Sequence, residues 1–141
     1  MSENILVPMD DSDPAETALE HAIEQNPEAD ITVLNVYGVG GATVADGAVI
    51  VMNDEVREAA RHHAEEIFDR ARELAAEAGH EGELNTVAEE GDPKKVIPDH
   101  SAEYDAVYIG GHGRTGAARI LLGSVAETVV RRSPVPVTVV K

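Results

Sequence analysis

The sequence contains no cysteine and no tryptophan, and aromatic residues make up only 3% of it. The absence of cysteine excludes disulfides, thiolate catalysis and cysteine-ligated zinc or iron–sulfur centres. Because aromatics are scarce, a core must be built from Val, Ile, Leu and Ala. No apolar run approaches the roughly 18 residues that a membrane helix needs, so we expect no membrane contact. The first residues also lack the basic start of a signal peptide, which predicts a cytoplasmic protein.

Positive charge is scarce as well. The 141 residues include 27 Asp and Glu but only 11 Lys and Arg, for a net charge of −16, and the lysines are Lys94, Lys95 and Lys141. Such a chain repels phosphate backbones, so nucleic-acid binding is disfavoured. An excess of acid with almost no lysine is typical of proteins kept soluble in concentrated salt, because salt screens the repulsion between carboxylates. We therefore expect a halophilic source, with an acidic mesophilic surface as the alternative.

Short apolar segments alternate with amphipathic ones along a chain whose length fits one domain over residues 1–141. The expected strands cover residues 4–8, 31–36, 83–88, 105–109 and 135–140. The expected helices start with Asp13 as N-cap, run over residues 54–78, start again at Asp92, and run over residues 124–132. Pro98 should keep the third helix short or kinked. The glycine-rich residues 38–52 are expected to form a flexible loop, with a second phosphate-binding loop as the alternative.

Strands that alternate with helices predict right-handed crossovers and a parallel sheet with helices on both faces, an α/β fold. The near-continuous apolar strands agree, because a parallel sheet is buried on both sides. Open sheets of this kind bind ligands beyond the carboxyl ends of their strands, where the strand order reverses. The candidate ligand-binding segments are therefore residues 9–11, 37–38, 89–91 and the segment from Gly110 onward.

The strongest motif lies between the fourth expected strand and the last helix. Its pattern is G-x2-G-x9-G-S, formed by Gly110, Gly113, Gly123 and Ser124. Glycines let the backbone approach an anion closely, and a helix capped by Ser124 would add N–H groups and the positive end of its dipole. Two arginines at positions 114 and 119 supply cations. The pattern predicts a triphosphate cradle; the alternative is a loop whose glycines serve turn geometry alone.

With these segments the chain resembles the universal stress protein family, in its ATP-binding branch. The resemblance covers essentially the whole chain and rests on residues 4–10, 33–36, 91–93, 105–127 and 133–140. It implies a three-layer Rossmann-like fold, of the adenine nucleotide alpha hydrolase-like type, with a five-stranded parallel sheet, usually dimeric. Three residues depart from the family pattern. Asp11 stands where many members have Gly, Gly111 stands where many have Ser, and Pro98 is a departure away from the predicted site.

The resemblance also implies a role for each site residue. Asp10, with Pro8 and the backbone of Val36, would hold the adenine. The turn that would contact ribose and phosphates consists of Gly110, Gly111, His112 and Gly113. The residues that would complete the phosphate cradle are Arg114, Thr115, Gly116, Gly123, Ser124 and Val125. The implied ligand is ATP, with ADP or AMP as alternatives, and Mg²⁺ is expected to arrive with the nucleotide because the acidic chain disfavours a bare tetra-anion.

Two classes of function fit these expectations. The first is an ATP-binding regulatory module of the stress response, and the second is a slow ATP-hydrolysing or adenylyl-transfer enzyme. An efficient hydrolase needs a positioned base and usually a lysine and metal-holding carboxylates, but residues 110–124 contain no lysine. His112 could act as a general acid, although we expect it only to line the cradle. Binding without fast turnover is preferred, with no metal held by the protein alone; the downstream partner stays unassigned.

The last strand predicts self-association. Pro134 and Pro136 have no N–H to donate, so they suit the margin of a sheet. An apolar strand at a margin is hazardous unless it is covered or paired. In the family that this chain resembles, this strand commonly pairs with its twofold mate. We therefore expect a homodimer formed through the strand from Val135 to Val140.

Overall fold

The computed structural model describes residues 3–38, 42–45, 48–51, 53–111 and 122–141. Five strands form the central sheet: β1 (Asn4–Pro8), β2 (Asp30–Tyr37), β5 (Leu84–Glu90), β6 (Ala106–Gly110) and β7 (Val137–Val140). They lie in the order β5-β2-β1-β6-β7, and every neighbouring pair is parallel. The predicted five-stranded parallel sheet is confirmed. The chain builds outward from β1 in both directions, so the strand order reverses between β1 and β6.

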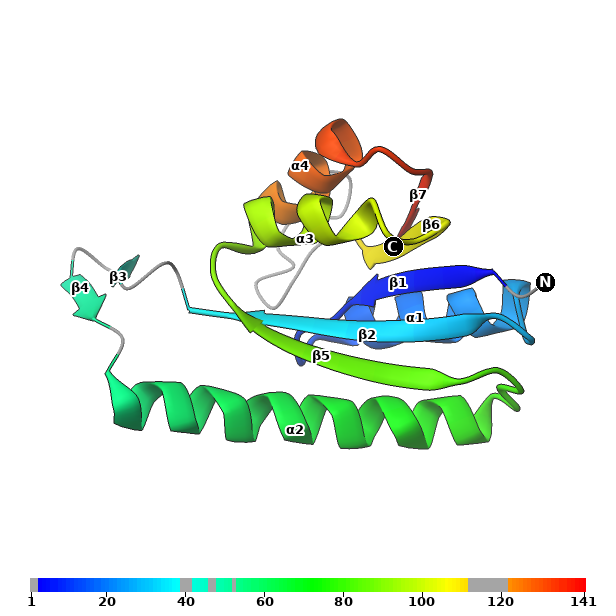
Figure 1. Ribbon diagram of the computed structural model, residues 1–141, viewed down its shortest axis with the longest axis horizontal. Coiled ribbons are helices and arrows are strands. Elements are labelled where there is room, and N and C mark those ends of the chain that lie inside the picture. The colour runs from blue at the N-terminus through cyan, green and yellow to red at the C-terminus, as the bar shows by residue number, and fades with distance from the viewer. Residues whose placement is uncertain (1–2, 39–41, 46–47, 52, 112–121) are drawn as a thin grey trace.

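Helices cover both faces of this sheet, which makes three layers (Figure 1). One face packs against α1 (Asp13–Gln25) and α2 (Asp54–Glu77), and the other against α3 (Pro93–Ser101) and α4 (Ser124–Arg132). Because successive strand residues point to opposite faces, Ile5 and Val7 of β1 enter the first layer and Leu6 enters the second. In the described part of the chain, no helix is long and apolar enough to span a bilayer.

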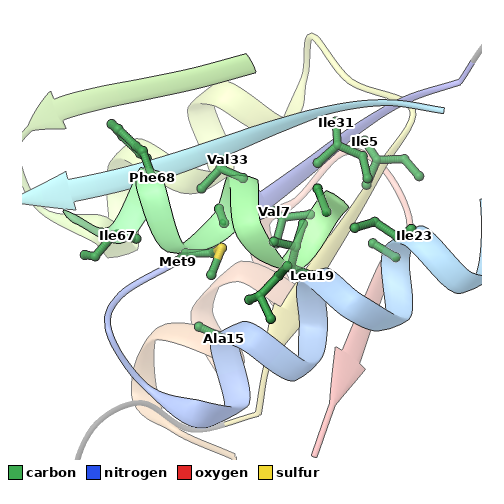
Figure 2. Close-up of a cluster of buried hydrophobic side chains, with 14 of the residues drawn as sticks. Ile5, Val7, Met9, Ala15, Leu19, Ile23, Ile31, Val33, Ile67 and Phe68 are labelled. Atoms are coloured by element: carbon green, nitrogen blue, oxygen red, sulfur yellow. The ribbon is translucent and has the colours of Figure 1, made fainter. Parts of the chain in front are cut away.

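The core is aliphatic, as the composition predicts, with Phe68 of α2 added (Figure 2). The buried side of α2 consists of Ala64, Ile67, Phe68, Ala71, Leu74 and Ala75. Sequence periodicity extends this side to Val56 and Ala78, but Val56 is half-buried and Ala78 is exposed. The reason is length: 24 helical residues span about 36 Å, whereas the eight residues of β2 span only about 26 Å. The ends of α2 therefore have no sheet to cover.

Two helix starts differ from the prediction. The N-cap of α1 is Ser12, not Asp13: its backbone is extended and its Oγ accepts the N–H of Ala15 at 3.3 Å. The N-cap of α4 is Gly123, which leaves Ser124 as the first helical residue rather than the cap. By contrast, α3 begins at an Asp92 cap as predicted and stays short, nine residues long, with Pro98 inside it.

The segment expected to be a flexible loop contains a hairpin. β3 (Ala42–Ala45) and β4 (Ala48–Val51) pair antiparallel, with Ala42 opposite Val51 and Ala45 opposite Ala48. The expectation of a loop was wrong because the β-branched residues of the segment favour strands, although glycines flank them. The dipeptide Asp46-Gly47 between two β-branched runs is a hairpin signal in the sequence, although these two residues lie outside the described ones.

Candidate functional site

A cleft of about 370 Å³ opens at the carboxyl edge of the sheet. It lies where β1 and β6 meet and the strand order reverses, the place where open α/β sheets bind ligands. Its volume falls within the range of small-molecule sites. The described residues that line it are Pro8, Met9, Asp10, Ser12, Ala15, Leu34, Asn35, Val36, Pro93, Ile97, Ile109, Gly110, Gly123, Ser124, Val125 and Ala126.

The turn after β1 holds a carboxylate in this cleft. The N–H of Met9 donates to the carbonyl of Leu34 at 2.8 Å, and Asn35 Nδ2 donates to the carbonyl of Met9 at 2.9 Å, so the backbone before Asp10 is fixed. Asp10 Oδ1 then accepts two hydrogen bonds from Ser12, from its N–H at 2.9 Å and from its hydroxyl. Within the described residues no donor reaches Asp10 Oδ2. One carboxylate oxygen is therefore anchored, and the other can accept from a ligand.

Apolar side chains form the walls around this carboxylate. Pro8 is buried at the end of β1 and Leu34 within β2, and the buried Ile97 of α3 and Ile109 of β6 pack with Leu34 in the second core cluster. Val36, near the end of β2, is half-buried. A slot with apolar walls and one hydrogen-bond acceptor suits a flat ligand that carries a donor at its edge.

Gly110, the first glycine of the motif, has a packing reason to be glycine. A Cβ at this position would lie 2.9 Å from the carbonyl carbon of Pro14 and 3.0 Å from its Cβ. The start of α1 thus approaches the end of β6 more closely than any side chain allows. This close approach lets the segment with Asp10 and Ser12 lie next to the end of β6. Gly110 therefore helps to set the position of the cleft wall that these residues form.

Both backbone polar groups of Gly111 form hydrogen bonds within the protein. Its N–H donates to the carbonyl of Val140 at 2.8 Å, and its carbonyl accepts the N–H of Gly123 at 2.6 Å. It is buried and does not line the cleft. Its N–H is therefore already engaged with β7 and its carbonyl with α4. The predicted contact of Gly111 with ribose or phosphates stays a prediction.

The start of α4 forms the other end of the cleft. Gly123, Ser124, Val125 and Ala126 all line it. The N-cap is a glycine, and within the described ranges no side-chain cap accepts from the N–H groups of the first turn. Those groups carry the partial positive charge of the helix end, which favours an anion. Since Ser124 does not cap the helix, its hydroxyl is not committed to that role.

Seven predicted site residues come together in this cleft: Pro8, Asp10, Val36, Gly110, Gly123, Ser124 and Val125. The predicted residues His112, Gly113, Arg114, Thr115 and Gly116 lie outside the described residues. The prediction missed Ser12, the partner of Asp10, and the α3 wall of Pro93 and Ile97. A serine two residues after a strand-end aspartate, before a helix, is a signal that could have identified the first; the second depends on how α3 packs.

Ion pairs surround the cleft without lining it. Arg57 of α2 donates to Glu90 at the end of β5 at 2.8 Å, and this carboxylate raises the pKa of Arg57 above its ordinary value. Arg61 donates to the hydroxyl of Tyr37 at 3.3 Å, and His63 lies 3.3 Å from Asp11. These contacts tie α2 to the carboxyl edge of the sheet and so hold the rim of the cleft in place.

The sheet order, the helices on both faces and the cleft at the reversal point define a Rossmann-like α/β protein with a small-molecule site. The universal stress protein family matches residues 1–141, and the chain belongs to this family. A protein of Staphylococcus aureus strain USA300 that is named as a universal stress protein is 32% identical over 144 residues, covering 99% of this chain and 84% of that relative.

Two solved structures extend the likeness to three dimensions. The universal stress protein UspA from Lactobacillus plantarum superposes with a TM-score of 0.80 at 25% identity, covering 99% of this chain and 97% of that chain. A universal stress protein solved in complex with cAMP superposes with a TM-score of 0.65 at 26% identity, covering 99% of this chain and 97% of that one.

Proposed function

We propose that this protein binds an adenine nucleotide in the cleft between β1 and β6, with ATP as the preferred ligand. In this proposal it acts as a nucleotide-dependent regulatory module of the stress response. One observation carries the proposal: a single cleft is lined both by Asp10, whose Oδ1 is fixed by Ser12, and by the start of α4, which has no side-chain cap among the described residues. The complex of a similar universal stress protein with cAMP supports the choice of an adenine nucleotide.

The base would occupy the apolar end of the cleft. Adenine is flat and carries an exocyclic amino group, which is a donor. Asp10 Oδ2 would accept from this group, while Pro8 and Val36 would pack on the faces of the ring. Because Ser12 fixes the carboxylate before the ligand arrives, little rotational freedom would be lost on binding.

The phosphates would lie toward the start of α4. The N–H groups of Ser124 and Val125 are oriented by the helix and need no rearrangement to meet an anion. In the proposal, His112, Gly113, Arg114, Thr115 and Gly116 complete the cradle, and Mg²⁺ arrives with the nucleotide and balances charge that a protein of net charge −16 would otherwise repel.

Binding is favoured over rapid chemistry. Among the described residues that line the cleft, Asp10 is the one ionisable side chain, and it is placed at the base end rather than the phosphate end. Phosphoryl transfer needs charge stabilisation and an oriented nucleophile beside the terminal phosphate. Slow ATP hydrolysis or adenylyl transfer is the alternative, and release of phosphate at about 1 s⁻¹ or faster would favour it.

The proposed assembly is a homodimer through β7. This strand lies at one margin of the sheet, as predicted, so one row of its backbone groups faces away from β6 (Figure 1). Val137 and Val139 pack on the second core yet stay half-buried, and Val130 of α4 is 45% exposed. A second copy of β7 would pair these backbone groups and cover the remaining apolar surface.

Two measurements test the binding site. Mass spectrometry of the acid-denatured protein would identify any nucleotide that copurifies. Calorimetry with Mg·ATP, ADP and AMP would then compare Asp10→Ala with Asp11→Ala, which removes the same charge one residue away from the cleft. We expect Asp10→Ala to weaken binding about tenfold or more, as for a hydrogen bond to a charged group, and Asp11→Ala to change it little. Equal affinities in the two variants would show that Asp10 does not hold the adenine base.

A further inference from the structure

A second concave surface lies between α3 and α4, away from the cleft. It is a groove of about 490 Å³ lined by Lys94, Lys95, Pro98, Asp99, Ala102, Arg132 and Pro134. Lys94, Pro98 and Ala102 recur every four residues and so share one face of α3, while Arg132 and Pro134 come from the end of α4 and the turn after it. The two helices pack side by side on the same face of the sheet (Figure 1).

This groove collects basic side chains that have no acidic partner. Among the described residues, Arg57, Arg70, Arg72 and Arg131 each lie within ion-pair distance of a carboxylate, and Arg61 donates to Tyr37. Lys94, Lys95, Arg132 and Lys141 form no such pair in the described part of the chain. Three of these four line the groove, together with one carboxylate, Asp99, with which none of them forms an ion pair in the described part of the chain. In a chain with 27 acidic and 11 basic residues, randomly placed basic side chains would mostly lie near a carboxylate, so a cluster without ion pairs is unexpected.

Helix electrostatics make the placement of the lysines more unusual. The first turns of α1, α2 and α4 all contain Asp or Glu, as the positive helix end favours, but the first turn of α3 contains none. Two of the chain's three lysines, Lys94 and Lys95, stand there instead. The N-cap, Asp92, supplies the carboxylate that this helix end favours, and its Oδ1 accepts the N–H of Lys94 at 3.0 Å. The side chains of Lys94 and Lys95 form no ion pair with it or with another described carboxylate, so their charges are open to a partner.

The groove is preformed. Ser101, fully buried at the end of α3, meets the hydroxyl of Ser133 after α4 at 3.3 Å. Ser133 Oγ also donates to the carbonyl of Val135 at 2.8 Å, which fixes the turn that carries Pro134. Prolines on both sides add stiffness. A partner would therefore meet a rigid floor with charged rims, and binding would order few protein side chains beyond the lysines and the arginine.

We propose that this groove is a docking surface for an acidic segment of another protein. The nine residues from Lys94 to the C-cap Ala102 rise about 12 Å along the helix axis. Because Ser133 meets Ser101, Arg132 lies near the end of α3, and the lysines lie near its start. An extended segment with carboxylates three or four residues apart matches that spacing, and its small apolar residues would cover Pro98, Ala102 and Pro134. A free phosphate would meet one end only. A short segment would contact the groove alone, whereas a long nucleic acid would also meet the rest of a chain whose net charge is −16.

The test uses the full chain and a labelled probe. Fluorescence anisotropy would follow an eight-residue peptide of alternating Glu and Ala, with the Gln-for-Glu peptide under the same label as its control. The variants are Lys94→Glu and Arg132→Glu, and Lys141→Glu is the matched control, since it reverses a lysine outside the groove. We expect the Glu peptide to bind at least about tenfold more tightly than the Gln peptide, and each groove variant to lose that advantage while Lys141→Glu keeps it within about twofold.

Several results would overturn the proposal. Equal binding of the Glu and Gln peptides would do so, as would an equal loss in Lys141→Glu. Displacement of the peptide by inorganic phosphate or by single-stranded DNA at similar concentration would reassign the groove to those anions. A change of oligomeric state in the groove variants, seen by light scattering, would assign it to a second copy of this chain. Calorimetry of ATP on Lys94→Glu separates this surface from the nucleotide cleft, since its affinity should stay unchanged.

Discussion

Replacing Gly110 by alanine tests how closely helix α1 approaches strand β6. The new Cβ would lie 2.9 Å from the carbonyl carbon of Pro14, a distance that forces the backbone of α1 to move. Overpacking of this kind costs about 1–3 kcal/mol, and the loss of glycine freedom in the unfolded chain returns about 0.4–1 kcal/mol. The net destabilisation should be about 1–2 kcal/mol, which lowers the Tm of a chain this long by about 3–8 °C.

The neighbouring glycine provides the matched control. A Cβ on Gly111 would meet Val139 Cγ1 at 3.4 Å, an ordinary contact, and its backbone φ is not positive. Gly111→Ala should therefore leave the unfolding free energy within about 0.5 kcal/mol of the parent or raise it slightly. Urea unfolding of both variants at the same salt concentration measures the difference. If Gly110→Ala is as stable as Gly111→Ala, then α1 does not press on β6 and the packing explanation of this glycine fails.

Three further changes test other parts of the structure. Ser12→Ala removes the α1 cap and the anchor of Asp10, so it should lower stability by about 1 kcal/mol and weaken ATP binding, whereas Thr17→Ala on the same helix should do neither; equal thermal melts would refute the cap. Raising KCl from low to molar concentration should raise the Tm, because salt screens a net charge of −16, and a flat curve would speak against adaptation to salt. Val137→Lys should convert the proposed homodimer to monomer in light scattering at molar salt, and a parent protein that is already monomeric at micromolar concentration would remove the dimer from consideration.

The strands and the sheet could be predicted because most strands are nearly continuous apolar runs, with the weaker β5 (LNTVAEE) as the exception, and because the segments between them have helical periodicity. What local sequence cannot show is a contact between distant residues. The motif predicts that Gly110 is a phosphate-binding glycine. In the structure, a side chain at this position is excluded by the backbone of Pro14, which lies 96 positions earlier in the sequence. The same holds for Ser12 and Asp13, which are equally good caps; the bond from Ser12 to Asp10 selects the first.

The candidate site was predictable in part for the same reason. The end of the first strand predicts the segment 9–11 with Asp10, whereas Pro8 and Val36 are implied by the family resemblance; all three line the cleft. The wall formed by Pro93 and Ile97 was not, because it depends on how α3 tilts over the sheet. Likewise Gly123 rather than Ser124 caps α4, since the chain enters the helix one residue earlier than the preferred cap residue suggests.

Gly111 joins two regions that are otherwise separate. Its N–H meets the last residue of the edge strand β7, and its carbonyl meets the N-cap of α4, which lines the cleft. A ligand that shifts the start of α4 must therefore act on the same residue that holds the sheet margin. Thermodynamic linkage makes such a connection reciprocal: if nucleotide favours pairing at the margin by some factor, pairing favours nucleotide by the same factor. Nucleotide binding in the cleft and pairing of β7 between two copies would then rise and fall together.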